Sequence, residues 1–520
     1  MRAGSKKIRW IVMLPPWIIL TAFFALSLVD YDLFLSVTST CVSVLLDKFA
    51  WMFNWITLGS VILVIATYLL PVGRVRIGGA GAVPIISYRN YIWIVLCTIM
   101  GAGLMLWVCA EPMYHLTAPP SNVAAGAYSG EAVLWAMENI LLEWTFPAMA
   151  LYGIPTVLFA FVFYNMRKKF SVGSMLTPLL GDRRVERWSV PIDIICLFSI
   201  VAGLSCTLGS GILLIMEGVT QVSGGRIRND LPSWIICGLV IVAAYTISAS
   251  TGLKKGIKYL STINSWFYLA IGIFVFLAGP SAYILNLLSD SFGAFLSDFF
   301  RLSLNTSTAS GGGWSHWWAQ FYWLIAFAWM PISSVFLGRI SKGYTVRQVL
   351  NVVFLIPSIF SVIWVSIFSC SSIYYELEKK GIYASMTEGT IASASYAVIR
   401  CLPLAGLLMV LFIIAAFLSY VTSADSNTNA IASLCTAGLS EEDAESPLIL
   451  KVFWGLTTGA VCIAMLSAYG MDGMKMLADL GGFPSAFLMI GFLVSWILIM
   501  RNPAGYDVHK NDYGPDGRPV

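Results

Sequence analysis

Apolar stretches long enough to cross a membrane recur along almost the whole sequence, and they restrict its fold more than any other feature. A helix needs about 20 residues to cross roughly 30 Å of hydrocarbon. Short polar segments separate the stretches, so each one predicts a separate span. The sequence therefore predicts an all-α integral membrane protein with twelve transmembrane helices. The predicted spans are residues 10–29, 51–71, 91–110, 132–165, 189–217, 232–252, 264–288, 317–340, 348–374, 402–434, 451–469 and 479–500.

The composition agrees with a membrane protein and narrows the class of function. Hydrophobic residues make up 58% of the chain and charged residues 11%, whereas soluble domains contain about a quarter charged residues. The lipid bilayer is therefore the expected surrounding. The net charge of +4 is small and dispersed, which argues against nucleic acid as a partner. The ten cysteines form no C-x-x-C pair and the three histidines no metal-ligand spacing, so no cofactor is expected.

The distribution of basic residues predicts the orientation of the chain. If the N-terminus lies inside, the inner segments carry 23 of the 31 Lys and Arg residues, and the outer segments, including the one with Lys475, carry 8. Basic residues remain on the cytoplasmic side because translocating them is costly. We therefore expect a multi-pass protein of the cytoplasmic (inner) cell membrane with both termini in the cytoplasm.

Two predicted spans contain residues that interrupt helices. Gly101 and Gly103 lie in the middle of the third span, and Pro331 lies within the eighth. In transporters, such breaks free backbone groups that can bind a solute at mid-membrane. We expect these three residues to form broken helices that take part in gating.

The fourth span carries aromatic residues suited to a cation. Trp144 and Tyr152 are eight residues apart, so on one continuous helix they would lie within about 80° of each other. A quaternary ammonium group cannot donate a hydrogen bond, but the negative face of an aromatic ring attracts its charge. Tryptophans in membrane proteins also form interfacial belts, so this pattern alone leaves both roles open.

Four motifs resemble the betaine/carnitine/choline transporter family. The strongest is "FYW…WMPISSVFLGRISKGYTVRQ" at 321–348, and the others are "EP" at 111–112, "KKGIKYLSTIN" at 254–264 and "YVTSADSNT" at 420–428. They occur in the family's order. The resemblance implies a LeuT-like fold, in which two N-terminal helices precede a five-plus-five inverted repeat, and a homotrimer.

The resemblance also divides the chain into segments. Residues 1–90 would be the two-helix extension and residues 91–288 the first repeat, spans 3–7. Residues 289–315 would form an outer amphipathic helix and a loop, because Phe292, Phe295, Phe299 and Phe300 share one helical face. Residues 316–500 would be the second repeat, spans 8–12, and residues 501–520 a short cytoplasmic tail.

The resemblance assigns an aromatic substrate box, which this chain has in reduced form. Met149 stands where a second Trp is usual, Ile325-Ala326 replaces a Trp pair, and Glu143 replaces a common His. A methionine still offers a polarisable contact. Glu143 could balance a cationic substrate or face a neighbouring helix, and we favour the second interpretation. The substrate-binding residues implied are Trp107, Trp144, Met149, Tyr152, Trp329 and Met330.

The polar stretch "YVTSADSNT" directly follows an apolar run, and the resemblance explains it as a sodium site. Na⁺ is a hard cation that hydroxyl and carbonyl oxygens satisfy. The implied ligands are the hydroxyls of Thr422 and Ser423, with backbone carbonyls near Cys97, Met100 and Ser419. Hydroxyls that bond to their own helix are the alternative explanation. The family's second sodium site is not expected, because Ile200, Leu204 and Ile332 occupy its positions.

These expectations combine into a functional hypothesis. The favoured function is a secondary active transporter that imports a small quaternary-ammonium compound of the choline, betaine or carnitine type by Na⁺ symport through one sodium site. The alternatives are a Na⁺-independent substrate/product exchanger, a carrier of a non-quaternary zwitterion, and a membrane sensor of solutes. An enzyme is not expected, because no H-E-x-x-H or G-x-S-x-G motif is present.

Overall fold

The computed structural model describes residues 7–123, 125–250, 256–439 and 446–519. This part of the chain is almost entirely helical, and its one sheet pairs two short strands, β1 (Lys7–Ile8) and β2 (Thr436–Ala437), in antiparallel fashion. The long helices are α1 (Trp10–Val29), α2 (Tyr31–Leu69), α3 (Tyr88–Ile99), α4 (Ala102–Thr117), α5 (Gly130–Trp144), α6 (Phe146–Ala160), α8 (Asp182–Val222), α9 (Leu231–Ser250), α10 (Gly256–Ala278), α11 (Ser281–Ser303), α12 (Phe321–Arg339), α14 (Ile356–Leu377), α17 (Ala405–Leu434) and α18 (Leu448–Arg501). Short helices are α7 (Thr177–Leu180), α13 (Val346–Leu350), α15 (Ile382–Glu388), α16 (Ser393–Arg400) and α19 (Pro503–Tyr506).

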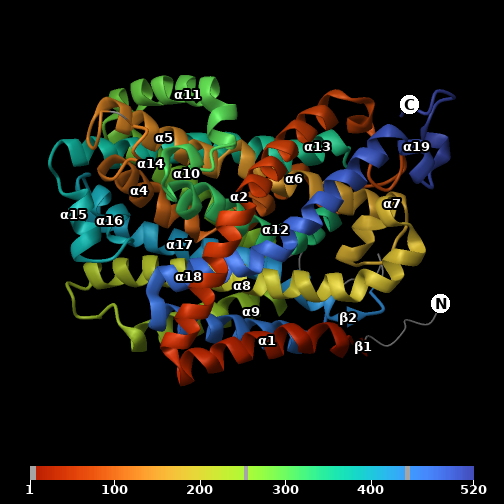
Figure 1. Cartoon of the computed structure of the whole chain (residues 1–520), viewed down its shortest axis with the longest axis horizontal. Coiled ribbons are helices and arrows are strands. Elements are labelled where there is room, and N and C mark those ends of the chain that lie inside the picture. Colours follow the sequence, from red (N-terminus) through yellow and green to blue (C-terminus); the bar gives the residue numbers. More distant parts are fainter. Residues whose placement is uncertain (1–6, 124, 251–255, 440–445, 520) are drawn as a thin grey trace.

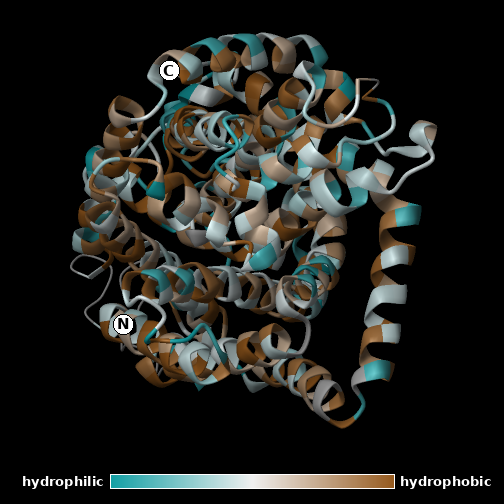
Figure 2. Ribbon diagram, turned by 90° about the vertical axis from the view of Figure 1, so that its left-hand side faces the viewer, coloured by the Kyte–Doolittle hydropathy of each residue, from teal (hydrophilic) through white to brown (hydrophobic). Residues whose placement is uncertain are grey.

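The helices confirm a multi-pass membrane protein. Among the described residues, ten helices are long and apolar enough to cross a membrane, or eleven if α3 and α4 form one bent span. The apolar part of α1, Trp10–Leu26, is shorter than these. Figure 2 shows hydrophobic segments, in brown, on the outside of the bundle as well as within it. Large apolar side chains such as Trp51, Ile236 and Trp266 are exposed there, as expected for a surface that faces lipid.

Long helices that pack along one another form the centre of the bundle. The 41-residue α8 packs along α18 and α17, and α12 packs against both α18 and α6. In Figure 1, α8 and α18 lie side by side through the middle of the molecule, and α1 lies along its lower edge. β1 and α19, near the two ends of the chain, lie at the same end of the long axis.

The end of the seventh span differs from the sequence prediction. The seventh span ends at Ala278, where Gly279 and Pro280 separate α10 from α11, so the predicted span 264–288 wrongly includes the start of the next helix. α11 carries the predicted phenylalanines, of which Phe295 is buried and Phe300 is exposed.

The predicted outer loop between the last two spans is helical instead. α18 runs from Leu448 to Arg501 across a kink at Gly470, whose φ of 58° and ψ of −141° lie outside the helical region. Glycine has no Cβ and adopts such a backbone without steric cost. The next helix therefore begins at once, and Lys475 is inside the protein with only 8% of its surface exposed.

The eighth span is not broken at Pro331, contrary to the sequence expectation. A π-helical turn (His316–Gln320) leads directly into α12, and the helix continues through Pro331 to Arg339. A proline removes one backbone donor, and neighbouring helices and hydroxyl groups can compensate inside a membrane. The surrounding residues of α12 are buried and pack against α6, α8 and α18, and this packing supports the helix across the proline.

The contact between α12 and α18 predicts that Gly482→Ala is destabilising. A Cβ at Gly482 would overlap the backbone carbonyl of Leu324 on α12, and overpacking of this kind costs about 1–3 kcal/mol. We expect a clearly lower thermal unfolding temperature for the purified variant in detergent. Gly459→Ala in the same helix is the matched control, because its Cβ would lie 3.4 Å from Val242, an ordinary contact. Equal unfolding temperatures for the two variants would contradict this packing.

Candidate functional site

A cavity lies where two helix pairs are broken, next to the centre of the bundle. It has a volume of about 90 Å³, several times the space that one water molecule needs. α4, α5, α6, α8 and α12 all contribute to its wall. Its lining side chains include Trp107, Trp144, Met149, Tyr152, Thr207, Tyr322 and Trp329.

The first break separates α3 from α4 at the glycine motif. α3 ends at Ile99, the residues Met100 and Gly101 leave the helical conformation, and the two helices meet at an angle of 53°. Gly101 and Gly103 both line the cavity. A Cβ at Gly103 would lie 3.7 Å from the Trp144 ring, an ordinary contact, so the backbone at Gly103 runs beside this tryptophan.

The second break was not predicted from the sequence. α5 ends at Trp144, Thr145 has φ −116° and ψ −127°, and α6 starts at Phe146. The expectation that Trp144 and Tyr152 share one face of a continuous helix is therefore wrong, because the helix axis is interrupted between them. Both nevertheless line the cavity. The signal in the sequence was Pro147, which lies in the first turn of α6, where a proline is tolerated because its missing N–H has no partner within the helix.

Five of the six predicted substrate residues line the cavity: Trp107, Trp144, Met149, Tyr152 and Trp329. The sixth, Met330, is fully buried and does not belong to the cavity wall. It follows Trp329 on α12, and adjacent residues on a helix point about 100° apart.

Gly203 on α8 determines where the Trp329 ring lies. A Cβ at this position would be 2.6 Å from Cδ1 and 2.8 Å from Nε1 of Trp329. These distances are shorter than atomic contact allows, so only glycine leaves room for the ring.

The cavity wall also carries a hydrogen-bonded polar group that the sequence analysis did not assign to the site. Tyr322 donates its hydroxyl hydrogen to Oε2 of Glu111 at 2.5 Å, and Trp144 donates Nε1–H to the same oxygen at 3.0 Å. The rings of Trp144 and Tyr322 meet edge to face at 5.0 Å. The "EP" motif thus positions the ring of a substrate-box tryptophan through its glutamate.

Lys475 occupies part of the aromatic surface. Its Nζ lies 4.5 Å from the ring centre of Trp107, 5.1 Å from Trp318 and 4.9 Å from Phe321. Ammonium groups at such distances are attracted to the ring faces. One ring that the resemblance assigned to the substrate therefore already contacts a cation of the protein.

The five predicted sodium ligands come together from α3 and α17. Cys97, Met100, Ser419, Thr422 and Ser423 are all buried. Ser423 donates to the carbonyl of Thr98 across the interface at 3.0 Å, whereas Thr422 donates to its own helix at Leu418, 2.8 Å away. Each hydroxyl thus uses its hydrogen on a carbonyl, and its lone pairs remain able to accept a cation.

Two residues of α10 complete this cluster, and neither was assigned to it from the sequence. Asn264 donates to Ser419 at 3.0 Å, Ser419 donates to Tyr268 at 2.7 Å, and Tyr268 donates to the carbonyl of Met100 at 3.1 Å. Among the described residues, the buried oxygens Asn264 Oδ1 and Ser261 Oγ have no hydrogen-bond partner. Unpartnered oxygens beside the carbonyls at the end of α3 fit a hard cation such as Na⁺.

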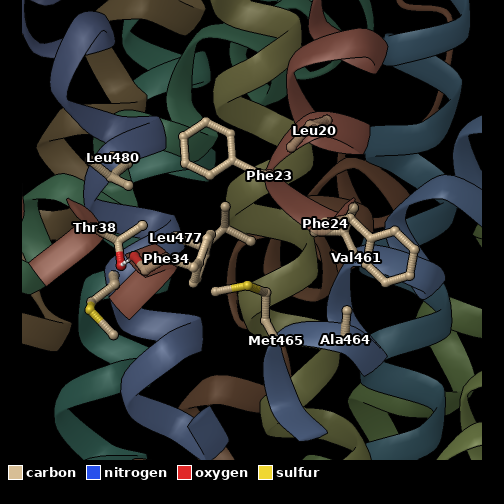
Figure 3. A pocket seen from close by; sticks show the side chains of 11 residues that line it. Leu20, Phe23, Phe24, Phe34, Thr38, Val461, Ala464, Met465, Leu477 and Leu480 are labelled. Atoms are coloured by element: carbon tan, nitrogen blue, oxygen red, sulfur yellow. Dashed lines mark hydrogen bonds between the residues drawn. The ribbon is translucent and has the colours of Figure 1, made fainter. Parts of the chain in front are cut away.

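A crevice between α1, α2 and α18 is smaller and more apolar than the cavity at the helix breaks (Figure 3). Its wall is apolar except for Thr38, whose hydroxyl donates to the carbonyl of Phe34 on its own helix at 2.7 Å. Its volume is about 10 Å³, no more than one water molecule requires. It is a gap in the packing and carries no polar group for a solute.

Comparisons with known proteins agree with the sequence motifs. The profile of the BCCT family, described as betaine/carnitine/choline family transporter, matches residues 11–505. An ectoine/hydroxyectoine transporter of Virgibacillus pantothenticus is 29% identical over 86% of this chain and 88% of its own length. Glycine betaine transporter 1 of Vibrio parahaemolyticus is 27% identical over 88% of this chain and 87% of its own length. A solved Na⁺-coupled sialic acid symporter aligns over 86% of this chain and 87% of its own with 14% identity and a TM-score of 0.46.

The contact between Gly203 and Trp329 predicts that Gly203→Ala weakens solute binding. The added methyl group would displace the Trp329 ring from the cavity wall, and a lost ring contact to a cation costs about 0.5–2 kcal/mol. We expect a rise of about tenfold in the dissociation constant, measured by calorimetry on purified protein. Gly238→Ala is the control, because its Cβ would lie 3.4 Å from the end of the Ile212 side chain. Unchanged affinity in Gly203→Ala would show that the ring does not contact the solute.

Proposed function

The chain belongs to the betaine/carnitine/choline transporter family, and on that premise we propose that it imports a small quaternary-ammonium or related zwitterionic compound. It is a membrane transporter and not an enzyme. The observation that carries the proposal is the cavity at the two helix breaks, where Trp144, Tyr152 and Trp329 present aromatic rings. Rings of this kind stabilise a methylated ammonium group that no hydrogen bond can hold.

A carboxylate on the solute also has a suitable place in this cavity. α4 begins at the break, with Gly101 as its N-cap residue. The free N–H groups and the positive end of a helix dipole favour a negative charge at such a terminus. A zwitterion could therefore place its carboxylate towards α4 and its cationic group towards the aromatic rings.

The identity of the solute depends on how many rings remain available to it. Met149 replaces one ring, and Trp107 contacts Lys475. Fewer cation–π contacts favour a zwitterion, whose carboxylate adds a second attachment at the start of α4, over a cation without a carboxylate such as choline. The relatives named for glycine betaine and for ectoine represent the two kinds of zwitterion that should be tested first.

We further propose that import is driven by Na⁺ symport through one site between α3 and α17. Thr422 and Ser423 would hold the ion with their hydroxyl oxygens, together with backbone carbonyls near Cys97, Met100 and Ser419. Bound Na⁺ would stabilise the carbonyls at the end of α3 and so link ion binding to the shape of the α3–α4 break. At the family's second sodium position, Ile200, Leu204 and Ile332 are buried apolar side chains.

The proposal includes a homotrimer in the cytoplasmic (inner) membrane with both termini in the cytoplasm. The positive-inside distribution of Lys and Arg supports this orientation. The position of β1 and α19 at the same end of the molecule is compatible with it.

Uptake of labelled solutes into proteoliposomes tests the substrate. We expect glycine betaine or ectoine to accumulate, and Trp329→Leu to raise the half-saturating concentration about tenfold because a cation–π contact is lost. Trp55→Leu is the control, because Trp55 is an exposed residue of α2 far from the cavity wall. If neither solute nor choline nor carnitine enters, the proposed substrate class is wrong.

An imposed Na⁺ gradient tests the coupling ion. We expect uptake to require inward Na⁺, and Ser423→Ala to raise the Na⁺ concentration for half-maximal uptake at least tenfold because one oxygen ligand is lost. Ser433→Ala on the same helix is the control, since its hydroxyl only bonds back to Asn429. Uptake that ignores Na⁺ and depends on internal solute would instead identify an exchanger, and solute binding without uptake would identify a sensor.

A further inference from the structure

Two glutamates and a histidine face one another inside the membrane region, directly beside the cavity. Glu111 and His115 are on α4, and Glu143 is on α5. Their side-chain oxygen and nitrogen atoms lie within 4.8 Å of one another, and all three residues are buried. Ionisable groups at this depth are costly and usually have a function.

The hydrogen-bond donors around the two carboxyl groups are unequally distributed. Oε2 of Glu111 accepts from both Tyr322 and Trp144. Among the described residues, neither oxygen of Glu143 has a hydrogen-bond partner, although only 1% of its surface is exposed. Donors stabilise an ionised carboxylate, and their absence in a buried place favours the neutral acid. The lack of donors leaves Glu143 as the residue of the pair that carries a proton.

The other charged groups nearby do not remove the need for that proton. Lys475 of α18 interacts electrostatically with Glu111 and with Asp472 and Asp479 of its own helix, and Cys206 of α8 lines the cavity beside Glu143. His115 lies 3.7 Å from Glu111 between the rings of Trp314 and Trp318. One ammonium group cannot balance three buried carboxylates, and two adjacent carboxylates in a dry place do not both remain ionised.

The pair is directly connected to the solute cavity. Glu143 lines it, Trp144 is the next residue, and the indole of Trp144 donates to Glu111. A positive group held against the ring of Trp144 therefore lies beside the two carboxyl groups. Its charge would balance the negative charge of the two carboxyl groups, as the proton on Glu143 does when the cavity holds no solute.

We propose that Glu143 and Glu111 form a cation subsite of the cavity in which the positive group of the solute replaces a proton. This inference rests on the proposed function. It gives a role to Glu143, which stands where the family commonly has a histidine. When the solute binds, the O–H bond of Glu143 breaks, the electron pair stays on the carboxylate oxygen, and the proton leaves to water. When the solute leaves, Glu143 takes up a proton again.

A proton on Glu143 fits this site better than a bound metal ion. Glu111 Oε2 already accepts two hydrogen bonds, and Lys475 adds a positive charge that would repel a metal ion. The oxygen cluster between α3 and α17 offers neutral ligands without such a cation. The two sites therefore suit different positive species.

The linkage between proton and solute fixes the direction of the pH dependence. Protonation of Glu143 competes with the positive group of the solute, so acid weakens binding. Where one proton is released for each solute bound, the dissociation constant rises up to tenfold for each unit by which the pH falls. Binding in weakly buffered solution should likewise acidify the medium by up to one proton per solute.

The test measures both quantities on the purified, full-length protein with glycine betaine and ectoine as probes. Calorimetry between pH 5 and 8 gives the dissociation constant, and a pH-sensitive dye gives the protons released. In the wild type we expect the dissociation constant to depend on pH and binding to release protons. In Glu143→Gln we expect neither the pH dependence nor the proton release, whatever the affinity of this variant for the solute. Glu138→Gln is the matched control, because Glu138 is a buried glutamate on the same helix α5 that does not line the cavity.

Three results would overturn the inference. The first is binding of either probe to the wild type without pH dependence or proton release. The second is proton release caused by Na⁺ alone, which would assign the pair to the coupling ion. The third is pH dependence that persists in Glu143→Gln. Absence of binding for both probes, choline and carnitine would instead contradict the proposed function itself, and this inference with it.

Discussion

Backbone groups that a helix break frees inside a membrane must find partners within the protein, and this requirement organises the region around the cavity. At the α3–α4 break the carbonyl of Met100 accepts from Tyr268, and the carbonyl of Thr98 accepts from Ser423. Water cannot supply these bonds in hydrocarbon. α10 and α17 must therefore approach the break closely, and their approach gathers the oxygens of the candidate sodium site.

The same requirement connects the two candidate sites. The carbonyl ends of α3 face the oxygen cluster, while Gly101 and Gly103 on the other side of the break line the solute cavity. A positive ion at one side and a zwitterion at the other would both stabilise one geometry of the break. Gly103 lies beside Trp144, whose indole in turn contacts Glu111. Solute, coupling ion and proton would thus act on a connected group of side chains.

Much of the site could be predicted because its motifs are local in sequence. The apolar stretches placed nearly every long helix, and five of the six predicted substrate residues line one cavity. Lys475 could not be placed, because its position depends on a kink at Gly470, where the second of two spans begins without the predicted loop. Tyr268 and Asn264 could not be assigned either, since their bonds to Ser419 and Met100 join helices far apart in the chain.

The sequence by itself determined that the chain is an α-helical membrane protein of a transporter family, because hydrophobic length and short motifs are properties of contiguous residues. Only the tertiary structure decided that the fourth span breaks at Thr145 and that the eighth continues through Pro331. It also decided that Glu143 faces Glu111. These outcomes depend on which neighbouring helices supply hydrogen bonds, packing space and charge, and those neighbours come from distant parts of the chain.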